Sequence, residues 1–378
     1  MHVLLTTDTV GGVWTFTREL SAGLLEANIS VTLVSFGGTP SVEQQGWADA
    51  LHEHHPDRFQ FHAFDIPLEW MPSNNRAFSA GEAALSRLID HVAPDLLHAN
   101  QFCFGATKGG LPRLVTAHSD VLSWADACRP HGLEPSPWLT CYRTLVQRGL
   151  DAAEVVVAPT HAMLHALGRH FHLGNQRRVI ANGRTFPKAA NPQPVRQLQA
   201  VTAGRLWDEA KNIALLSRIQ SAVPILVAGE QQFSDHQQLS AAPSLHLTGA
   251  LTESQLLELF HASAIYIAPS LYEPFGLAPL EAALCGCAIL ANDIPSLREV
   301  WGDAALYFHS AAELEQLLEQ LATNPDLLAG AQQRAHARAL TFSRDAMVQA
   351  YLNVYRELTR AAQPPLAQPA TTDQPRVA

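Results

Sequence analysis

Two glutamates eight residues apart, Glu273 and Glu281, form the clearest chemical pattern in this sequence. A carboxylate can accept hydrogen bonds from paired hydroxyl groups, as a sugar or a ribose presents them. Glu273 follows an apolar run that ends in a proline, and Glu281 lies in a helix-prone stretch that continues to Leu284. The pattern favours a polyol site, although a capping carboxylate followed by an exposed helical glutamate has the same spacing.

Two cations, Arg205 and Lys211, follow a second apolar run, residues 198–204. Arginine offers a planar fork of donors and lysine a point charge, so together they can neutralise a diphosphate. The chain contains only three lysines. Lys211 is therefore less easily explained as a solubilising surface charge, and the pair predicts an anion site.

Both patterns require a strand, a loop and a helix in that order. In open α/β sheets ligands bind at the carboxyl ends of the strands, where the first N–H groups of a helix favour an anion. Residues 264–284 and 198–216 both have this order of apolar run, loop and helix-prone stretch. We therefore expect the two carboxylates and the two cations to lie at the carboxyl edge of one parallel sheet.

The segment Glu-Pro-Phe-Gly-Leu followed by Glu281 resembles the E-x7-E motif of retaining glycosyltransferases with the GT-B fold, most closely those of family 4. Gly-Arg-Leu with Lys-Asn, at residues 204–212, resembles the cations that hold the donor diphosphate in that family. The resemblance covers residues 1 to about 360. It implies an α/β protein of two Rossmann-like α/β/α domains that face each other across a deep cleft.

The resemblance implies a nucleotide-sugar donor bound by the second domain. Glu281 would hold the ribose, and Arg205 and Lys211 the diphosphate, where negative charge grows as the sugar leaves. Glu273 would bind the sugar hydroxyls. Further donor contacts are expected from Leu247 and Thr248 beside the base and from the backbone of Phe275, Gly276 and Leu277.

The first domain would complete the site. Gly11 and Gly12 resemble the family's glycine-rich loop over the donor diphosphate, and glycines there let backbone approach a ligand closely. His118 resembles the strand-end histidine beside the transferred sugar, although a single histidine is also a common structural residue. We expect the acceptor near Trp14 and Asn100, with packing in the core as the alternative for Trp14.

The domain boundaries follow from composition and from the same resemblance. A chain of 378 residues suits two domains. We expect the acceptor domain at residues 1–186, completed by a C-terminal helix at about 343–360, and the nucleotide-sugar domain at 187–342. A linker is expected at 186–197, because this stretch is rich in proline and lacks periodicity. Residues 361–378 should be a disordered tail.

Charge and hydropathy limit the partners. The net charge of −10 disfavours nucleic acid and gives no general attraction to anionic lipid. No run of eighteen apolar residues occurs, and residues 1–9 do not resemble a signal peptide. We therefore expect a cytoplasmic protein with at most peripheral membrane contact. A basic cluster at residues 169–178 leaves lipid-linked acceptors open, and the oligomeric state is not indicated.

We expect no cofactor and no metal requirement. The sequence lacks a D-x-D motif, by which another glycosyltransferase architecture holds a metal against the diphosphate. The five cysteines lack the C-x2-C spacing of zinc sites. Of two histidine groups, the one at residues 52–62 lacks a ligand geometry, and the one at residues 161–172 lacks the glutamate of H-E-x-x-H. The negative charge on the leaving diphosphate would then be neutralised by Arg205, Lys211 and helix N-termini.

The predicted function is retaining transfer of a hexosyl unit from a nucleotide sugar, with a UDP-sugar expected, to a hydroxyl of a glycan, a lipid-linked sugar or a small molecule. No carboxylate is evidently placed as a nucleophile, so we expect same-face attack with the departing phosphate oxygen as base. A GDP-mannose-dependent mannosyltransferase, an epimerase or phosphorylase on the same fold, and a non-catalytic sugar-nucleotide-binding protein stay open.

Overall fold

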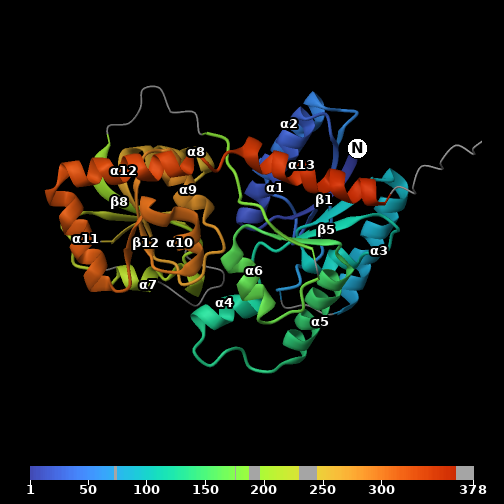
Figure 1. Cartoon of the computed structure of the whole chain (residues 1–378), viewed down its shortest axis with the longest axis horizontal. Helices are drawn as coiled ribbons and strands as arrows, with labels where there is room; N and C mark the ends of the chain where they lie inside the picture. Colours follow the sequence, from blue (N-terminus) through green and yellow to red (C-terminus); the bar gives the residue numbers. More distant parts are fainter. Residues whose placement is uncertain (72–74, 175, 187–195, 230–244, 363–378) are drawn as a thin grey trace, which may run out of the picture.

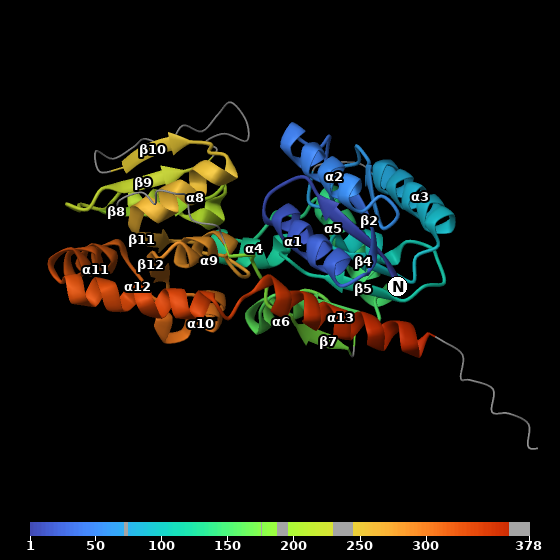
Figure 2. The same cartoon turned by 90° about the horizontal axis from the view of Figure 1, so that it is seen from above.

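The computed structural model describes residues 1–71, 75–174, 176–186, 196–229 and 245–362, and it has two α/β halves (Figures 1 and 2). The first half holds a seven-stranded sheet in the order β3-β2-β1-β4-β5-β6-β7, and the second a six-stranded sheet in the order β10-β9-β8-β11-β12-β13. All paired strands are parallel. The predicted class, two Rossmann-like α/β domains, is confirmed.

The first sheet carries helices on both faces, as parallel sheets require. Its strands are β1 His2–Asp8, β2 Ser30–Phe36, β3 Phe59–Ala63, β4 Leu96–Ala99, β5 Arg113–Thr116, β6 Val155–Ala158 and β7 Arg177–Val179. Its helices are α1 Gly12–Glu26, α2 Val42–His54, α3 Asn75–Val92, α4 Val121–Cys128, α5 Pro137–Ala152 and α6 His161–Gly168, with a 3-10 turn η1 at Phe102–Ala106.

The second half has the same alternation of strand and helix. Its strands are β8 Gln197–Ala203, β9 Ile225–Ala228, β10 Leu245–Gly249, β11 Ser263–Ala268, β12 Ala288–Asn292 and β13 Leu306–Phe308. Its helices are α7 Ile213–Leu216, α8 Glu253–Ala262, α9 Leu277–Leu284, α10 Pro295–Trp301, α11 Ala311–Thr323 and α12 Pro325–Ala339, with 3-10 turns η2 at Glu209–Lys211 and η3 at Gly302–Ala304.

The last helix, α13 Arg344–Ala361, returns to the first half and packs beside α1 (Figure 1). Its buried Tyr355 hydroxyl lies 2.6 Å from Nδ1 of His98, and the Tyr351 hydroxyl lies 3.2 Å from Oγ1 of Thr116. These contacts join the end of the chain to β4 and β5. Most of the expected linker and residues 363–378 of the expected tail lie outside the described residues.

The two halves touch through the loops at the carboxyl ends of their strands. The Tyr272 hydroxyl, from the loop after β11, accepts a hydrogen bond from the Asp120 N–H at 3.2 Å. Thr160 donates to the Pro274 carbonyl at 2.9 Å, and the Glu299 carboxylate accepts from the first two N–H groups of α6 at 2.7 and 2.8 Å. These hydrogen bonds hold segments at the strand ends of the two sheets against one another.

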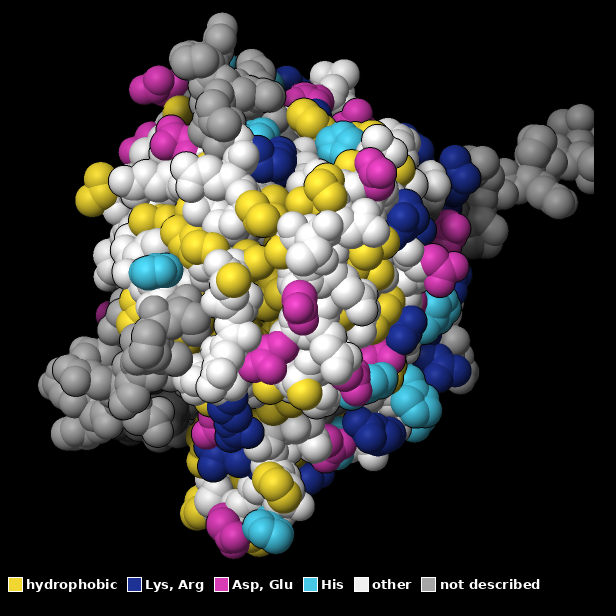
Figure 3. All heavy atoms as spheres, turned by 90° about the vertical axis from the view of Figure 1, so that its left-hand side faces the viewer, with side chains coloured by type: hydrophobic (Ala, Val, Ile, Leu, Met, Phe, Trp, Pro, Cys, Tyr) yellow, Lys and Arg dark blue, Asp and Glu magenta, His cyan; other side chains and the backbone are white. Residues whose placement is uncertain are grey.

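The outer face of the second half, shown in Figure 3, mixes acidic, basic, polar and apolar side chains. This mixture agrees with the chain's modest charge density of 16% charged residues. Within the described ranges, no helix combines the length and the apolar character needed to cross a bilayer.

Candidate functional site

Two helix N-termini without side-chain caps meet where the halves touch. Gly11 precedes α1 and Gly276 precedes α9, and both have positive φ angles, 79° and 91°. A Cβ atom on Gly12 would lie 3.5 Å from Leu277, so the two N-termini approach closely. At Gly276 a Cβ atom would also come within 2.8 Å of Pro279. Glycine is thus required there, and the paired positive ends of two helix dipoles favour an anion.

Lys211 and Glu273 form an ion pair beside these N-termini. Lys211 Nζ lies 2.5 Å from Glu273 Oε2, and both side chains are mostly buried. The Ser270 hydroxyl also reaches this oxygen, at 3.3 Å. The ion pair holds a cation and a carboxylate close to Gly276 at the start of α9. A diphosphate that attracted Lys211 would release Glu273 to accept hydroxyl hydrogen bonds.

Arg205 lies beside the glycine loop that precedes α1. Its guanidinium donates to Asp208 at 2.9 Å and stacks over the Trp207 ring, yet 41% of the side chain is exposed. A Cβ atom on Gly11 would lie 3.6 Å from Arg205 Nη1, so the cation reaches the glycine loop of the first half. Because only Nη2 is hydrogen-bonded to Asp208 and Nη1 lies near Gly11, the partly exposed guanidinium can still bind an anion.

Glu281 is engaged by an arginine that the sequence did not single out. Arg184 lies 2.9 Å from Glu281, 2.6 Å from Glu19 and 2.7 Å from Glu253, and only 6% of its side chain is exposed. Burial alone would lower the pKa of Arg184, and the carboxylates of Glu281 and Glu19 outweigh this and raise it. Burial raises the pKa of Glu281, while Arg184 opposes the rise. Arg184 therefore joins α1, α8 and α9 and orients the carboxylate expected to hold the ribose.

We expect Arg184→Ala to destabilise the protein by about 3–5 kcal/mol, because three carboxylates lose a buried partner. Urea unfolding at pH 7 measures this change. The control is Arg344→Ala, which breaks a more exposed pair with Glu26 at 2.6 Å and should cost at most about 1 kcal/mol. Equal losses of unfolding free energy in the two variants would show that the Arg184 cluster stabilises the fold no more than an exposed ion pair does.

His118 and Asn100 act as a pair. The Asn100 amide nitrogen donates to the Thr6 carbonyl at 2.6 Å, which turns its oxygen toward His118 Nε2 at 2.7 Å. That nitrogen therefore carries the proton and Nδ1 is left as an acceptor. Burial lowers the pKa of His118 to about 3, so the ring is neutral at physiological pH. It can serve a sugar hydroxyl as a hydrogen-bond partner but not as a cation.

Three residues expected at the site have buried side chains. Trp14 is 8% exposed and packs edge-on against Trp47 and Phe61, because its position on α1 faces the core and not the contact between the halves. The Phe275 ring is buried against Phe342, which leaves the backbone, the part of this residue expected to contact the donor. Asn100 is buried and committed to Thr6 and His118. It positions the histidine, and its contact with an acceptor stays a prediction.

The expected base contacts, Leu247 and Thr248, lie on β10 at the edge of the second sheet. Leu247 packs against the core of this half, and Thr248 is exposed with its hydroxyl 3.2 Å from the Gly249 carbonyl. Residues 230–244, which precede them, lie outside the described residues. Among the described residues, no hydrogen bond joins either side chain to Arg205 or Lys211, and their role in binding the base stays a prediction.

Asp8, the last residue of β1, is a second residue that the sequence analysis missed. It is 7% exposed, its Oδ1 accepts from the Val10 N–H at 3.1 Å, and burial raises the pKa of its carboxyl to about 7. The signal available in the sequence was an acidic residue directly after the first strand. Its burial depends on packing that the sequence does not display.

The raised pKa of Asp8 makes a prediction about stability. The folded pKa lies above the unfolded value of 3.8, so the Asp8 carboxylate costs stability progressively as pH rises from 4 to 7 and fully above 7. Asp8→Asn should raise the unfolding free energy at pH 8 by about 1–3 kcal/mol and change it little at pH 4.5. Asp49→Asn on the exposed face of α2 is the control, and a pH-independent difference for Asp8→Asn would contradict the assignment.

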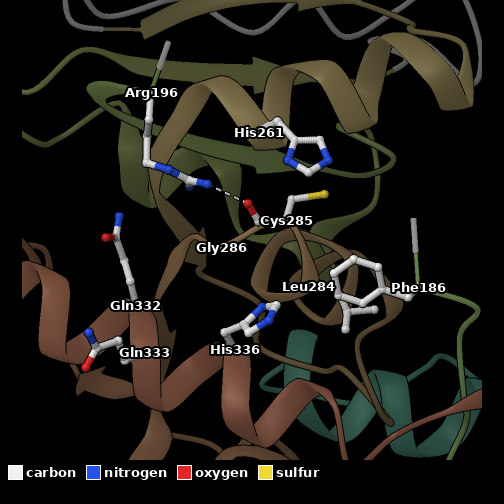
Figure 4. Close-up of a pocket in the computed structure, with 9 residues that line it drawn as sticks. All are labelled: Phe186, Arg196, His261, Leu284, Cys285, Gly286, Gln332, Gln333 and His336. Carbon is white, nitrogen blue, oxygen red and sulfur yellow. Dashed lines mark hydrogen bonds between the residues drawn. The ribbon is translucent and has the colours of Figure 1, made fainter. Parts of the chain in front are cut away.

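A hollow of about 350 Å³ lies away from the strand ends, between α8, α9 and α12 (Figure 4). Arg196 borders it, but its guanidinium donates to the carbonyls of Cys285 and Ser263 at 2.6 and 2.8 Å. Burial raises the pKa of the Cys285 thiol to about 12, so it is not a thiolate nucleophile. The polar groups here serve the fold, and we do not assign a site to this hollow.

The expectation about metals concerns the histidine groups. Neither group belongs to a metal-ligand cluster in the described part of the chain, where no set of three His, Cys, Asp or Glu side chains has suitable geometry. His170 instead lies 2.8 Å from Asp126, and His52 lies 2.8 Å from the Phe59 carbonyl. These histidines thus have local structural partners.

Comparisons with known proteins indicate the family of this chain. The model of Glycosyltransferase Family 4 matches residues 10–184, and that of Glycosyl transferases group 1 matches residues 194–338. A serotype-specific mannosyltransferase of Escherichia coli is 32% identical over 309 residues, which are 71% of this chain but 38% of that protein. The chain thus spans less than half of this relative. Alpha-maltose-1-phosphate synthase of Mycolicibacterium smegmatis is 26% identical over 67% of this chain and 76% of its own length.

Solved structures share the fold at low sequence identity. Sucrose-phosphate synthase from Thermosynechococcus elongatus has a TM-score of 0.73 at 18% identity and covers 96% of this chain and 100% of its own. The Anabaena protein HepE in complex with UDP has a TM-score of 0.65 at 17% identity, with 94% and 100% covered. The two consecutive family matches and the twin-sheet architecture together show that the chain belongs to the family 4 glycosyltransferases of the GT-B fold.

Proposed function

We propose that this protein transfers a hexosyl unit from a nucleotide sugar to an acceptor hydroxyl with retention of anomeric configuration and without a metal. The observation that carries the proposal is the Lys211–Glu273 ion pair beside the N-termini of α1 and α9. This ion pair would combine neutralisation of the diphosphate with recognition of the sugar, in the segments that follow β8 and β11. The relatives named above are glycosyltransferases, which supports a transferase.

The donor would lie with its diphosphate between Arg205 and Lys211 and its ribose against Glu281. As the bond from the anomeric carbon to the phosphate oxygen breaks, the charge on the diphosphate grows where both cations and two helix N-termini already lie. Preorganised charge of this kind is usually the largest contribution to catalysis. The acceptor hydroxyl would attack on the same face, and its proton would pass to the departing phosphate oxygen. Neutral His118 would hold a hydroxyl of the transferred sugar.

The identity of the donor is open between two candidates. The family as a whole favours a UDP-sugar, which the sequence analysis proposes. The E. coli relative is named a mannosyltransferase and matches 71% of this chain, which favours a mannosyl donor such as GDP-mannose. An epimerase or a phosphorylase on the same fold gains no support from the named relatives.

A thermal-shift panel of UDP, GDP, ADP and TDP, each with and without EDTA, tests the proposal. A nucleotide at a hundredfold excess over its dissociation constant should add about 2.7 kcal/mol to stability. We expect one base to raise the melting temperature equally in both conditions. A shift that EDTA abolishes would refute metal independence, and no shift with any nucleotide would refute the donor site.

A further inference from the structure

Trp124, on α4 of the first half, makes a hydrogen bond to the second half. Its indole Nε1–H donates to Asp208 Oδ1 at 3.0 Å. Asp208 directly precedes η2, in the segment that follows β8. The helix α4 and the turn η2 contact each other where the two halves meet (Figure 2). A tryptophan of one half therefore reaches a carboxylate that lies three residues after Arg205 in the other.

Asp208 connects Trp124 to Arg205. Its Oδ1 also accepts from the Ala210 N–H at 3.0 Å, while its Oδ2 accepts from Arg205 Nη2 at 2.9 Å. The Asp208 side chain is 9% exposed. Because two donors hold Oδ1, one from each half, the plane of the carboxylate is fixed and the position of Oδ2 with it. An indole nitrogen can only donate, so Trp124 is suited to hold an acceptor such as this one.

The position of Oδ2 decides the direction of the Arg205 guanidinium. This group is planar and its donors have fixed directions, so a bond to one nitrogen orients the others. The Trp207 ring, with its centroid 5.2 Å from Arg205 Cζ, supports one face of the guanidinium but does not set its rotation within its own plane. With Nη2 on Asp208, Nη1 lies 3.6 Å from the position of a Cβ atom on Gly11. Since 41% of the Arg205 side chain is exposed, burial does not hold it there.

The helix that carries Trp124 is also held against the second loop of the candidate site. Asp120 caps α4, and its backbone N–H donates to the Tyr272 hydroxyl at 3.2 Å. Tyr272 directly precedes Glu273. One helix of the first half thus contacts both the segment that carries Arg205 and the loop that carries Glu273.

We propose that Trp124 is a positioning residue for the transfer, and that it acts through Asp208 on the direction of Arg205. This inference rests on the proposed function, in which Arg205 neutralises the leaving diphosphate. A cation that points elsewhere still attracts the bound donor by its charge. It is, however, out of line with the charge that develops as the sugar leaves, and alignment of this kind contributes mainly to the transition state. Trp124 therefore affects the chemical step more than the binding of the donor.

The test uses Trp124→Phe, which removes the indole donor and keeps an aromatic ring. The full-length variant is given the nucleotide sugar that the thermal-shift panel selects, and release of nucleoside diphosphate is measured. This release reports cleavage of the same bond in transfer and in hydrolysis. We expect kcat to fall at least about tenfold. The dissociation constant of the nucleoside diphosphate, measured by calorimetry, should stay within about threefold of the wild-type value, because the charge of Arg205 is retained.

Two control variants separate this effect from a general loss of contacts. Trp138→Phe removes an indole donor inside the first half, where Nε1 donates to the Met71 carbonyl at 3.3 Å. Glu209→Gln breaks an exposed ion pair with Arg129, at 2.7 Å, across the same contact of α4 with η2. Neither change touches the bond to Asp208. Both variants should keep kcat within about twofold of the wild-type value.

A second variant tests the route through Asp208. Asp208→Asn keeps an oxygen for Trp124 and Ala210, but its amide nitrogen cannot accept from Arg205. It should lower kcat as Trp124→Phe does, and the double variant should be no slower than the slower single one, because both changes break the same chain of hydrogen bonds.

A purely structural role for Trp124 predicts a lower melting temperature with kcat retained, or losses of kcat that multiply in the double variant. Either result, or an equal loss of kcat in Trp138→Phe, overturns the positioning role while the transferase function stands. A wild-type protein that neither shifts with any nucleotide nor releases nucleoside diphosphate refutes the proposed function itself.

Discussion

Replacing Glu273 by glutamine is expected to lower kcat at least about a thousandfold, which corresponds to about 4 kcal/mol of transition-state stabilisation. In the structure this carboxylate is the partner of Lys211 at 2.5 Å. When the donor draws Lys211 to its phosphates, the carboxylate is left to accept hydrogen bonds from the sugar. Glutamine keeps the shape but loses the charge that these hydrogen bonds need.

Nucleotide affinity separates this role from a structural one. Glu273→Gln should bind nucleoside diphosphate at least as tightly as the wild type, because Lys211 no longer has to leave a carboxylate. Single-turnover kinetics with the nucleotide sugar, together with calorimetric titration of the diphosphate, measure both quantities. Glu258→Gln, on an exposed position of α8, is the control. A kcat within tenfold of the wild-type value would refute the proposed catalytic role of Glu273.

Replacing Lys211 by alanine is expected to reduce kcat/KM by about 30-fold to 1000-fold, or about 2–4 kcal/mol. Lys211 supplies positive charge where the leaving diphosphate develops negative charge. The loss should appear in kcat as well as in KM, because the charge on the diphosphate is larger in the transition state than in the bound donor.

Lys108→Ala is the matched control, since Lys108 is an exposed lysine of the first half. Lys211→Arg should recover part of the lost rate, because it restores the charge with a different geometry. Steady-state rates at several donor concentrations measure the split between kcat and KM. An effect confined to KM would mean that Lys211 binds the ground state and the transition state equally, contrary to its proposed role.

Local patterns were sufficient to predict much of the second half. Glu273, Lys211 and Gly276 lie within short stretches in which strand, loop and helix follow one another, so sequence spacing alone indicates that they share a sheet edge. The same holds for His118, which lies two residues after the end of β5. The carboxyl ends of parallel strands lie at one edge of the sheet, so this prediction needs no knowledge of contacts between segments far apart in the chain.

Other features depend on contacts between segments far apart in the chain. Arg184 meets carboxylates from α1, α8 and α9, and no spacing rule connects these positions. Trp14 follows the glycine loop directly, yet its side chain turns to Trp47 because the helix rotates it to the other face. Tertiary packing decides such positions, and a single sequence does not reveal it.

The central claim is transfer from a nucleotide sugar with retention, and proton NMR of the reaction in progress tests it most directly. The wild-type protein is incubated with the α-linked nucleotide sugar selected by thermal shift, methyl α-mannopyranoside or methyl α-glucopyranoside, and EDTA. We expect a new anomeric signal of an α-linked product that grows as the donor signal decays. A β-linked product would contradict retention, and decay of the donor only after metal is added would contradict metal-independent transfer.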